Sequence, residues 1–195
     1  RQVFSARHVV LAMAAQTLIL SILFATLMSS QQSFDIVLGR GDEFPLWFGA
    51  MAVLAASSNL VNARIVMRLG MAEVVKRTLL VHGIGTFLFL ALQLAGALEG
   101  TGLFVVAFAW FTSVFFLAGF CIGNVNAIAM EPMGHIAGLA ASIVAAISTV
   151  GSALIAAPIG QAFNGTLLPL TSGALGLVTL AFLLVRQLTE AGIDG

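Results

Sequence analysis

The chain has 195 residues, of which 60% are hydrophobic and 8% are charged, whereas an ordinary soluble domain has about a quarter charged residues. This composition excludes a soluble globular domain. Eight basic and eight acidic residues leave a formal net charge of zero, so the sequence provides no basic surface of the kind that binds nucleic acid.

Gaps between charged residues predict the membrane spans, because about 20 apolar helical residues cross a hydrocarbon core roughly 30 Å thick. These gaps, together with the turn-like Asn164-Gly165 before Pro169, predict six spans. In chain order they lie near residues 9–28, 46–63, 78–98, 103–130, 136–163 and 167–185. Residues 64–77 are predicted to form a loop and residues 186–195 a tail. The expected fold class is an all-α integral membrane protein.

Basic residues predict the orientation of the spans, because Lys and Arg are retained on the cytoplasmic side. All of them except Arg40 fall on one side: Arg1, Arg7, Arg64, Arg68, Lys76, Arg77 and Arg186. We therefore expect both termini and the loop 64–77 in the cytoplasm. Three spans lie on each side of the turn at residues 99–102, so the two sets of three enter the membrane from opposite sides, as in an inverted repeat.

The second and fifth spans are rich in small residues, whereas the third and sixth are rich in Leu and Phe. Small residues let helices approach closely in lipid, so we expect the second and fifth spans at interfaces and the third and sixth facing lipid. In the fifth span, contact ridges are predicted at Gly138 with Ser142, at Ala141 with Ala145, and at Ser148 with Ser152. The alternative is that all six spans simply pack into one bundle.

The fourth span carries Phe104, Phe108, Phe111 and Phe115 at helical spacing. Such a stripe could line a cavity for lipophilic or cationic ligands, or it could lie in the core or face lipid. Uncharged polar residues at membrane depth similarly indicate either hydrogen bonds between helices or a solute path. These residues are Gln16, Thr17, Asn59, Asn62, Gln93, Asn124 and Asn126.

Several kinds of chemistry find no support in the sequence. No Asp, Glu, Lys or Arg lies within a span, so we expect no proton carrier in this chain. Glu131 and His135 are four residues apart, but two ligands are too few for a metal site. The sequence also lacks the Gly-x-Ser-x-Gly and His-Glu-x-x-His motifs. We therefore expect no enzymatic activity, no metal and no cofactor, and we interpret Cys121 as a packing residue.

Two stretches resemble a known family. The segment Asn62-Ala-Arg-Ile-Val-Met-Arg-Leu-Gly70-Met is similar to the loop between helices eight and nine of major facilitator superfamily transporters. The segment Asn126-Ala-Ile-Ala-Met-Glu131-Pro-Met-Gly-His135-Ile-Ala-Gly138 resembles a stretch of bicyclomycin-resistance-type drug/proton antiporters. Arg68 and Gly70 match the loop signature, but Met67 occupies its acidic position and Met71 and Ala72 occupy basic ones.

The resemblance implies that the chain is the C-terminal six-helix half of a twelve-helix major facilitator fold, built as a 3+3 inverted repeat. It implies a drug or small-molecule efflux antiporter of the bacterial inner membrane that works by alternating access and is driven by a proton gradient. The implied partners are the lipid bilayer, a missing N-terminal six-helix half, and lipophilic or cationic small molecules. Because the sequence begins at Arg1, we interpret it as a fragment or a processed chain.

The resemblance also implies roles for individual spans. The first and fourth spans would line the cavity, with the candidates Gln16, Thr17, Phe108, Phe111 and Phe115, to which we add the polar Asn124. The second and fifth spans would meet the other half. Candidates for this packing and for gating are Asn59, Asn62, Arg68, Gly70, Gly138, Ser142, Gly151, Pro158 and Gly160, of which the last three resemble an antiporter Gly-Pro motif.

Two other interpretations remain open at this point. The chain could be a self-contained six-span channel, or a half-transporter that forms homodimers. It could also be a membrane scaffold that transports nothing.

Overall fold

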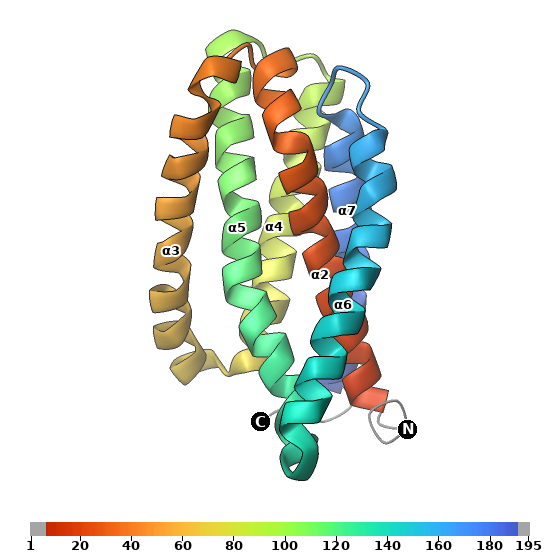
Figure 1. Cartoon of the computed structure of the whole chain (residues 1–195). Helices are drawn as coiled ribbons and strands as arrows, with labels where there is room; N and C mark the ends of the chain where they lie inside the picture. Colours follow the sequence, from red (N-terminus) through yellow and green to blue (C-terminus); the bar gives the residue numbers. More distant parts are fainter. Residues whose placement is uncertain (1–6, 191–195) are drawn as a thin grey trace.

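The computed structural model describes residues 7–190, which form a bundle of long helices (Figure 1). Within this part of the chain, six helices are long and apolar enough to cross a membrane. They are α2 (Arg7–Gln32), α3 (Phe44–Leu69), α4 (Met71–Leu94), α5 (Gly100–Met130), α6 (Ala137–Gln161) and α7 (Leu168–Glu190). The structure confirms the prediction of an all-helical protein with six candidate membrane spans.

The helix α2 lies at the centre of the bundle. It packs against α5, α6 and α7, while α4 packs against α5 and α7. On α2, the side chains of Ala12, Ala15, Ile19 and Ile22 are fully buried. A face of small and branched residues therefore forms the middle of the core.

By contrast, α3 stands at the edge of the bundle and packs mainly against α5 (Figure 1). Only Met51 and Ser58 are buried among its residues. The small residues of α3 predict a helix that packs at an interface. In this chain, however, most of the surface of α3 is uncovered.

The segment 64–77, which is predicted as a loop, is helical except at Gly70. Charged residues such as Arg64 and Lys76 limit how much of a helix lies in lipid, but they do not end the helix itself. Gly70 reverses the chain because its φ of +78° is accessible to glycine without strain, and its N–H donates to the Val66 carbonyl at 2.9 Å. In the predicted tail, α7 continues to Glu190, and residues 191–195 lie outside the described part.

The turn predicted at Asn164-Gly165 is present between α6 and α7. Gly165 has a φ of +82°, and the Asn164 side-chain oxygen accepts a hydrogen bond from the Thr166 backbone N–H at 3.2 Å. The Thr166 hydroxyl oxygen in turn accepts from the Leu168 N–H at 3.2 Å. This side-chain cap satisfies a backbone donor that the first turn of α7 would otherwise leave free.

Candidate functional site

Two helices leave regular stripes of small or polar residues uncovered. The exposed stripe on α3, which we call the α3 stripe, consists of Gly49, Ala52, Ala56, Asn59 and Ala63. The exposed stripe on α6, the α6 stripe, consists of Gly138, Ser142, Ala145, Thr149 and Ala153. Both follow the spacing of three and four residues that marks one helix face. Bulky residues are also uncovered on both helices, among them Leu60 on α3 and Leu154 on α6. The uncovered residues of α4 are mostly bulky and include Leu80, Ile84, Phe87 and Leu88.

A second set of small residues on α6 packs inside this chain, against α2. Ala140, Val144, Ser148, Ser152 and Ala156 are buried at intervals of four residues. The Ser148 hydroxyl donates to the Met13 carbonyl at 3.3 Å. The predicted ridge at Ser148 and Ser152 therefore lies within the bundle, whereas Gly138 and Ser142 belong to the exposed α6 stripe.

Two glycines of α6 mark how closely it approaches α2. A Cβ atom added at Gly151 would lie 2.9 Å from Cγ2 of Thr17, and one at Gly160 would lie 3.3 Å from Cβ of Met28. Pro158 lies between them and is exposed on the last turn of α6. The structure thus places Gly151 and Gly160 in the α2–α6 contact, not on an uncovered face.

The cavity candidates of α2 also lie against neighbouring helices. Gln16 is buried, and its Oε1 atom has no hydrogen-bond partner among the described residues. Thr17 is half-buried beside Gly151 and donates to the Met13 carbonyl at 2.8 Å. Gln16 therefore belongs to the buried face of α2, and Thr17 belongs to the α2–α6 contact.

The structure divides the aromatic stripe of α5 between the core and the α3 contact. Phe111 is fully buried and packs at ring-centroid distances of 5.8 Å from Phe34 and 5.4 Å from Trp110. Phe108 lies 5.3 Å from the Trp47 ring of α3. Phe115 similarly lies 5.8 Å from Phe48 of α3. The even spacing along the sequence therefore conceals two different environments.

Two predicted polar candidates meet across the α3–α5 contact. The Asn124 Nδ2 atom donates to Asn62 Oδ1 at 2.9 Å and to the Phe120 carbonyl at 2.7 Å. Asn59 lies on the exposed α3 stripe instead, and Arg68 is exposed near the end of α3. Asn62 and Asn124 therefore form a structural hydrogen bond between helices, one of the two readings that the sequence leaves open.

Sequence reasoning missed a groove of about 490 Å³ between α3, α4 and α5. Its walls are mostly apolar, but they include one imidazole, two hydroxyl side chains and the guanidinium group of Arg77. The residues that line it include Ile65 and Leu69 from α3, Thr78 and His82 from α4, and Ser113 and Phe116 from α5. The size lies within the range of small-molecule sites, about 300–1,000 Å³.

His82 is the centre of a polar chain in the groove wall. Its Nδ1 atom lies 3.1 Å from Oγ of Ser113, whose hydroxyl donates to the Trp110 carbonyl at 2.7 Å. Trp110 donates from Nε1 to the Thr86 hydroxyl oxygen at 3.0 Å, and Thr86 donates to the His82 carbonyl at 2.8 Å. His82 is not among the predicted candidates, because only Asp, Glu, Lys and Arg are considered there as ionisable residues within the spans. An imidazole within an apolar span is itself a signal of a functional site.

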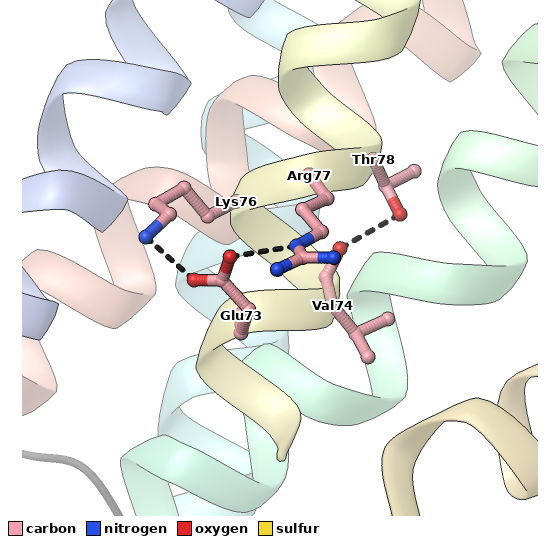
Figure 2. A network of polar contacts seen from close by, with 5 residues as sticks. All are labelled: Glu73, Val74, Lys76, Arg77 and Thr78. Atoms are coloured by element: carbon pink, nitrogen blue, oxygen red, sulfur yellow. Dashed lines mark hydrogen bonds and ion pairs between the residues drawn. The ribbon is translucent and has the colours of Figure 1, made fainter. Parts of the chain in front are cut away.

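The end of the groove nearest the α3–α4 turn is charged. Glu73 forms ion pairs with Lys76 and, at 2.7 Å, with Arg77 (Figure 2). On the same helix, Thr78 donates its hydroxyl proton to the Val74 carbonyl at 2.8 Å (Figure 2). The groove therefore runs from this ion-paired cluster to an apolar interior beside His82.

Comparisons with known proteins assign no family to the chain. No protein-family model, no curated protein and no solved structure matches it. Among the side chains that the structure describes, no group of three or more His, Cys, Asp or Glu gathers in a way that could hold a metal ion. What the chain does must therefore be inferred from its own residues.

Proposed function

We propose that this chain is one six-helix half of an alternating-access transporter that exports lipophilic small molecules. The observation that carries the proposal is the pair of uncovered small-residue stripes, one on α3 and one on α6. The α3 and α6 stripes consist of small or polar residues at helical spacing, which suit close contact with other helices. Bulky residues such as Val53 on α3 and Leu154 on α6 are exposed beside the stripes. A second six-helix half would cover the two stripes.

The packing order of the helices supports an inverted repeat. If α2, α3 and α4 are exchanged with α5, α6 and α7, the α2–α6 contact becomes the α5–α3 contact and the α2–α7 contact becomes the α5–α4 contact. The α2–α5 and α4–α7 contacts are unchanged by the exchange. This is the relation expected between two three-helix repeats of opposite topology, a recurrent feature of secondary transporters.

The charge distribution supports an orientation with both ends of the chain in the cytoplasm. Within the described residues, every Lys and Arg except Arg40 lies at the end of the bundle that holds the α3–α4 turn. Arg40 lies at the opposite end, beside Glu43. Cytoplasmic loops carry an excess of basic residues, and a bacterial inner membrane suits a drug/proton antiporter.

The proposal assigns the driving force to the second half. Because the spans of this chain hold no acidic residue at mid-depth, the proton that drives export would be carried by the partner half. This chain would contribute one wall and one set of gates. A complete channel, a homodimeric half-transporter and a scaffold are the alternatives that an experiment must separate.

The test is energy-dependent efflux of a fluorescent lipophilic cation from drug-sensitive bacteria that express the whole protein in which this sequence occurs. We expect efflux that stops when a protonophore collapses the proton gradient. Ala56→Trp, on the exposed α3 stripe, is expected to abolish efflux without unfolding the bundle. Leu180→Trp is the matched control on α7, since Leu180 is 53% exposed and predicted to face lipid, and it is expected to leave efflux intact.

Absence of energy-dependent efflux, or equal effects of the two tryptophan variants, would contradict the proposal. The purified 195-residue chain provides a further check after reconstitution into lipid vesicles. Vectorial export by this chain alone would favour a self-contained transporter over one half of a larger one.

A further inference from the structure

The groove between α3, α4 and α5 is separate from the α3 and α6 stripes. Its walls come from the side of α3 that faces α4 and α5, with Ile65 and Leu69 on α3 and Phe116 and Phe120 on α5. The residues named here as its walls all belong to this chain, so its ligand is inferred without relying on the transport proposal.

The hydroxyl groups of the groove wall donate their protons to backbone carbonyls and not to the groove. The Ser113 hydroxyl donates to the Trp110 carbonyl, and the Thr78 hydroxyl donates to the Val74 carbonyl. Because Ser113 has used its only proton, its contact with His82 requires that Nδ1–H donates to the Ser113 oxygen. In the neutral imidazole, Nε2 is then an acceptor.

Acceptor capacity is left over at the same place. The Ser113 and Thr78 oxygens each have a second lone pair, since a hydroxyl oxygen accepts up to two hydrogen bonds. His82 is 6% exposed, and its Nε2 atom is fully buried without a hydrogen-bond partner within the described residues, so the acceptors that remain for a ligand are the two hydroxyl oxygens. This polar patch inside an apolar groove offers acceptors and no unused hydroxyl or ring proton.

The patch is held in place by its surroundings. The His82 ring stacks on Trp110 with a centroid distance of 6.2 Å and an interplanar angle of 28°. Trp110 is fixed by its hydrogen bond to Thr86, which is bonded in turn to the His82 carbonyl. A site whose polar atoms are already positioned loses little entropy when a ligand binds.

From these contacts we propose that the groove binds a neutral, lipophilic small molecule through an O–H or N–H donor on that molecule. The donor meets the hydroxyl oxygens of Ser113 and Thr78, and the apolar body lies against Phe116 and Phe120. Arg77 and Lys76 at the charged end disfavour a cationic ligand there. Sugars and other polar solutes do not fit, because the remaining walls are apolar.

The test compares two ligands that differ only in the donor. The probes are 4-nonylphenol and its methyl ether, 4-nonylanisole, titrated against the purified chain in lipid nanodiscs. The sequence has two tryptophans, Trp47 and Trp110. In the Trp47→Phe variant only Trp110 remains, and its fluorescence reports occupancy of the groove through the stacked His82. We expect the phenol to bind about tenfold more tightly than the ether, the ratio produced by one hydrogen bond.

Glycine variants separate the groove from binding elsewhere. Gly85 lines the groove, and a Cβ atom added there meets nothing within 4 Å, so Gly85→Leu fills the groove without a clash in the bundle. It is expected to weaken phenol binding by about tenfold or more. Gly176→Leu is the matched control, because Gly176 is exposed on α7 and also has nothing within 4 Å of an added Cβ. It is expected to leave binding unchanged.

Ser113→Ala removes one acceptor and is expected to reduce the preference for the phenol over the ether to about twofold. Equal affinity for the phenol and the ether in the Trp47→Phe chain would overturn the proposal. So would phenol binding that survives Gly85→Leu, since the phenol would then be partitioning into lipid or occupying another site.

Discussion

The α2–α6 and α3–α5 pairs have the same arrangement, with two helices running in parallel (Figure 1), but they are packed differently. Along α2–α6, small residues recur every four positions on α6, and Gly151 brings the backbone of α6 close to Thr17. Along α3–α5, the contact consists of aromatic rings, the Asn62–Asn124 hydrogen bond and one close approach, where Gly119 lies beside Ser58.

This difference shows that a shared arrangement of helices does not fix how tightly they pack. Small residues on α6 let two backbones come together along their length, which maximises van der Waals contact in lipid. Aromatic residues on α5 instead contact α3 through side-chain rings, and a groove beside His82 lies between α3, α4 and α5. The tight pair forms the core of the bundle, and the loose pair provides space for a ligand.

The largest effect is expected where the α2–α6 contact is closest. In Gly151→Leu, even the Cβ atom would lie 2.9 Å from Cγ2 of Thr17, so α6 must move away from α2. We expect a loss of about 1–3 kcal/mol in the free energy of unfolding, measured by titration with a denaturing detergent and circular dichroism. Gly138→Leu on the same helix, with open space around its Cβ, is the control and should change the stability little.

A smaller effect is expected for the polar link of the loose pair. A double-mutant cycle of Asn62→Ala and Asn124→Ala should give a coupling energy of about 1 kcal/mol, typical of a hydrogen bond between membrane helices. The same cycle with Asn59→Ala in place of Asn62→Ala should give no coupling, because Asn59 lies on the exposed α3 stripe. A coupling near zero for Asn62 would mean that aromatic contacts alone hold α3.

The smallest effect is expected at the charged end of the groove. Glu73→Gln removes ion pairs with Lys76 and Arg77, whose side chains are 34% and 60% exposed. Such pairs on a helix surface contribute about 0.3–0.5 kcal/mol. The loss in stability should shrink further at high ionic strength, where surface charges are screened. A loss as large as that of Gly151→Leu would contradict the view that helix packing, not surface charge, dominates.

Features that depend on nearby residues could be predicted from the sequence. The number of candidate spans follows from the spacing of charged residues together with the turn that divides the uncharged stretch between Glu131 and Arg186. The α6–α7 turn follows from Asn164-Gly165, whose backbone and side-chain preferences act within a few residues. The prediction of a loop at residues 64–77 is wrong, because α3 and α4 both extend past their apolar segments. A single glycine, Gly70, is enough to reverse the chain between them.

Features that depend on tertiary packing could not be predicted in this way. Phe108 and Phe111 are both aromatic and lie one helical turn apart, but only Phe111 is fully buried, and no local pattern states which direction faces α2. His82 acquires its role from Ser113 on another helix, a juxtaposition that spacing along one helix does not reveal. Periodicity identifies a face of a helix, and the neighbouring helices decide what covers that face.

The central claim is that the α3 stripe is covered by other helices in the whole protein. It can be tested with an environment-sensitive fluorophore on a cysteine at position 56 or 180. For this, Cys121, the only cysteine of the 195 residues, and any cysteine elsewhere in the whole protein are replaced by alanine. Quenching by brominated lipids is then compared between the whole protein and the 195-residue chain. We predict that the label at position 56 is protected from lipid in the whole protein and quenched in the isolated chain, while the label at position 180 is quenched in both. Equal quenching at position 56 in both proteins would contradict the claim.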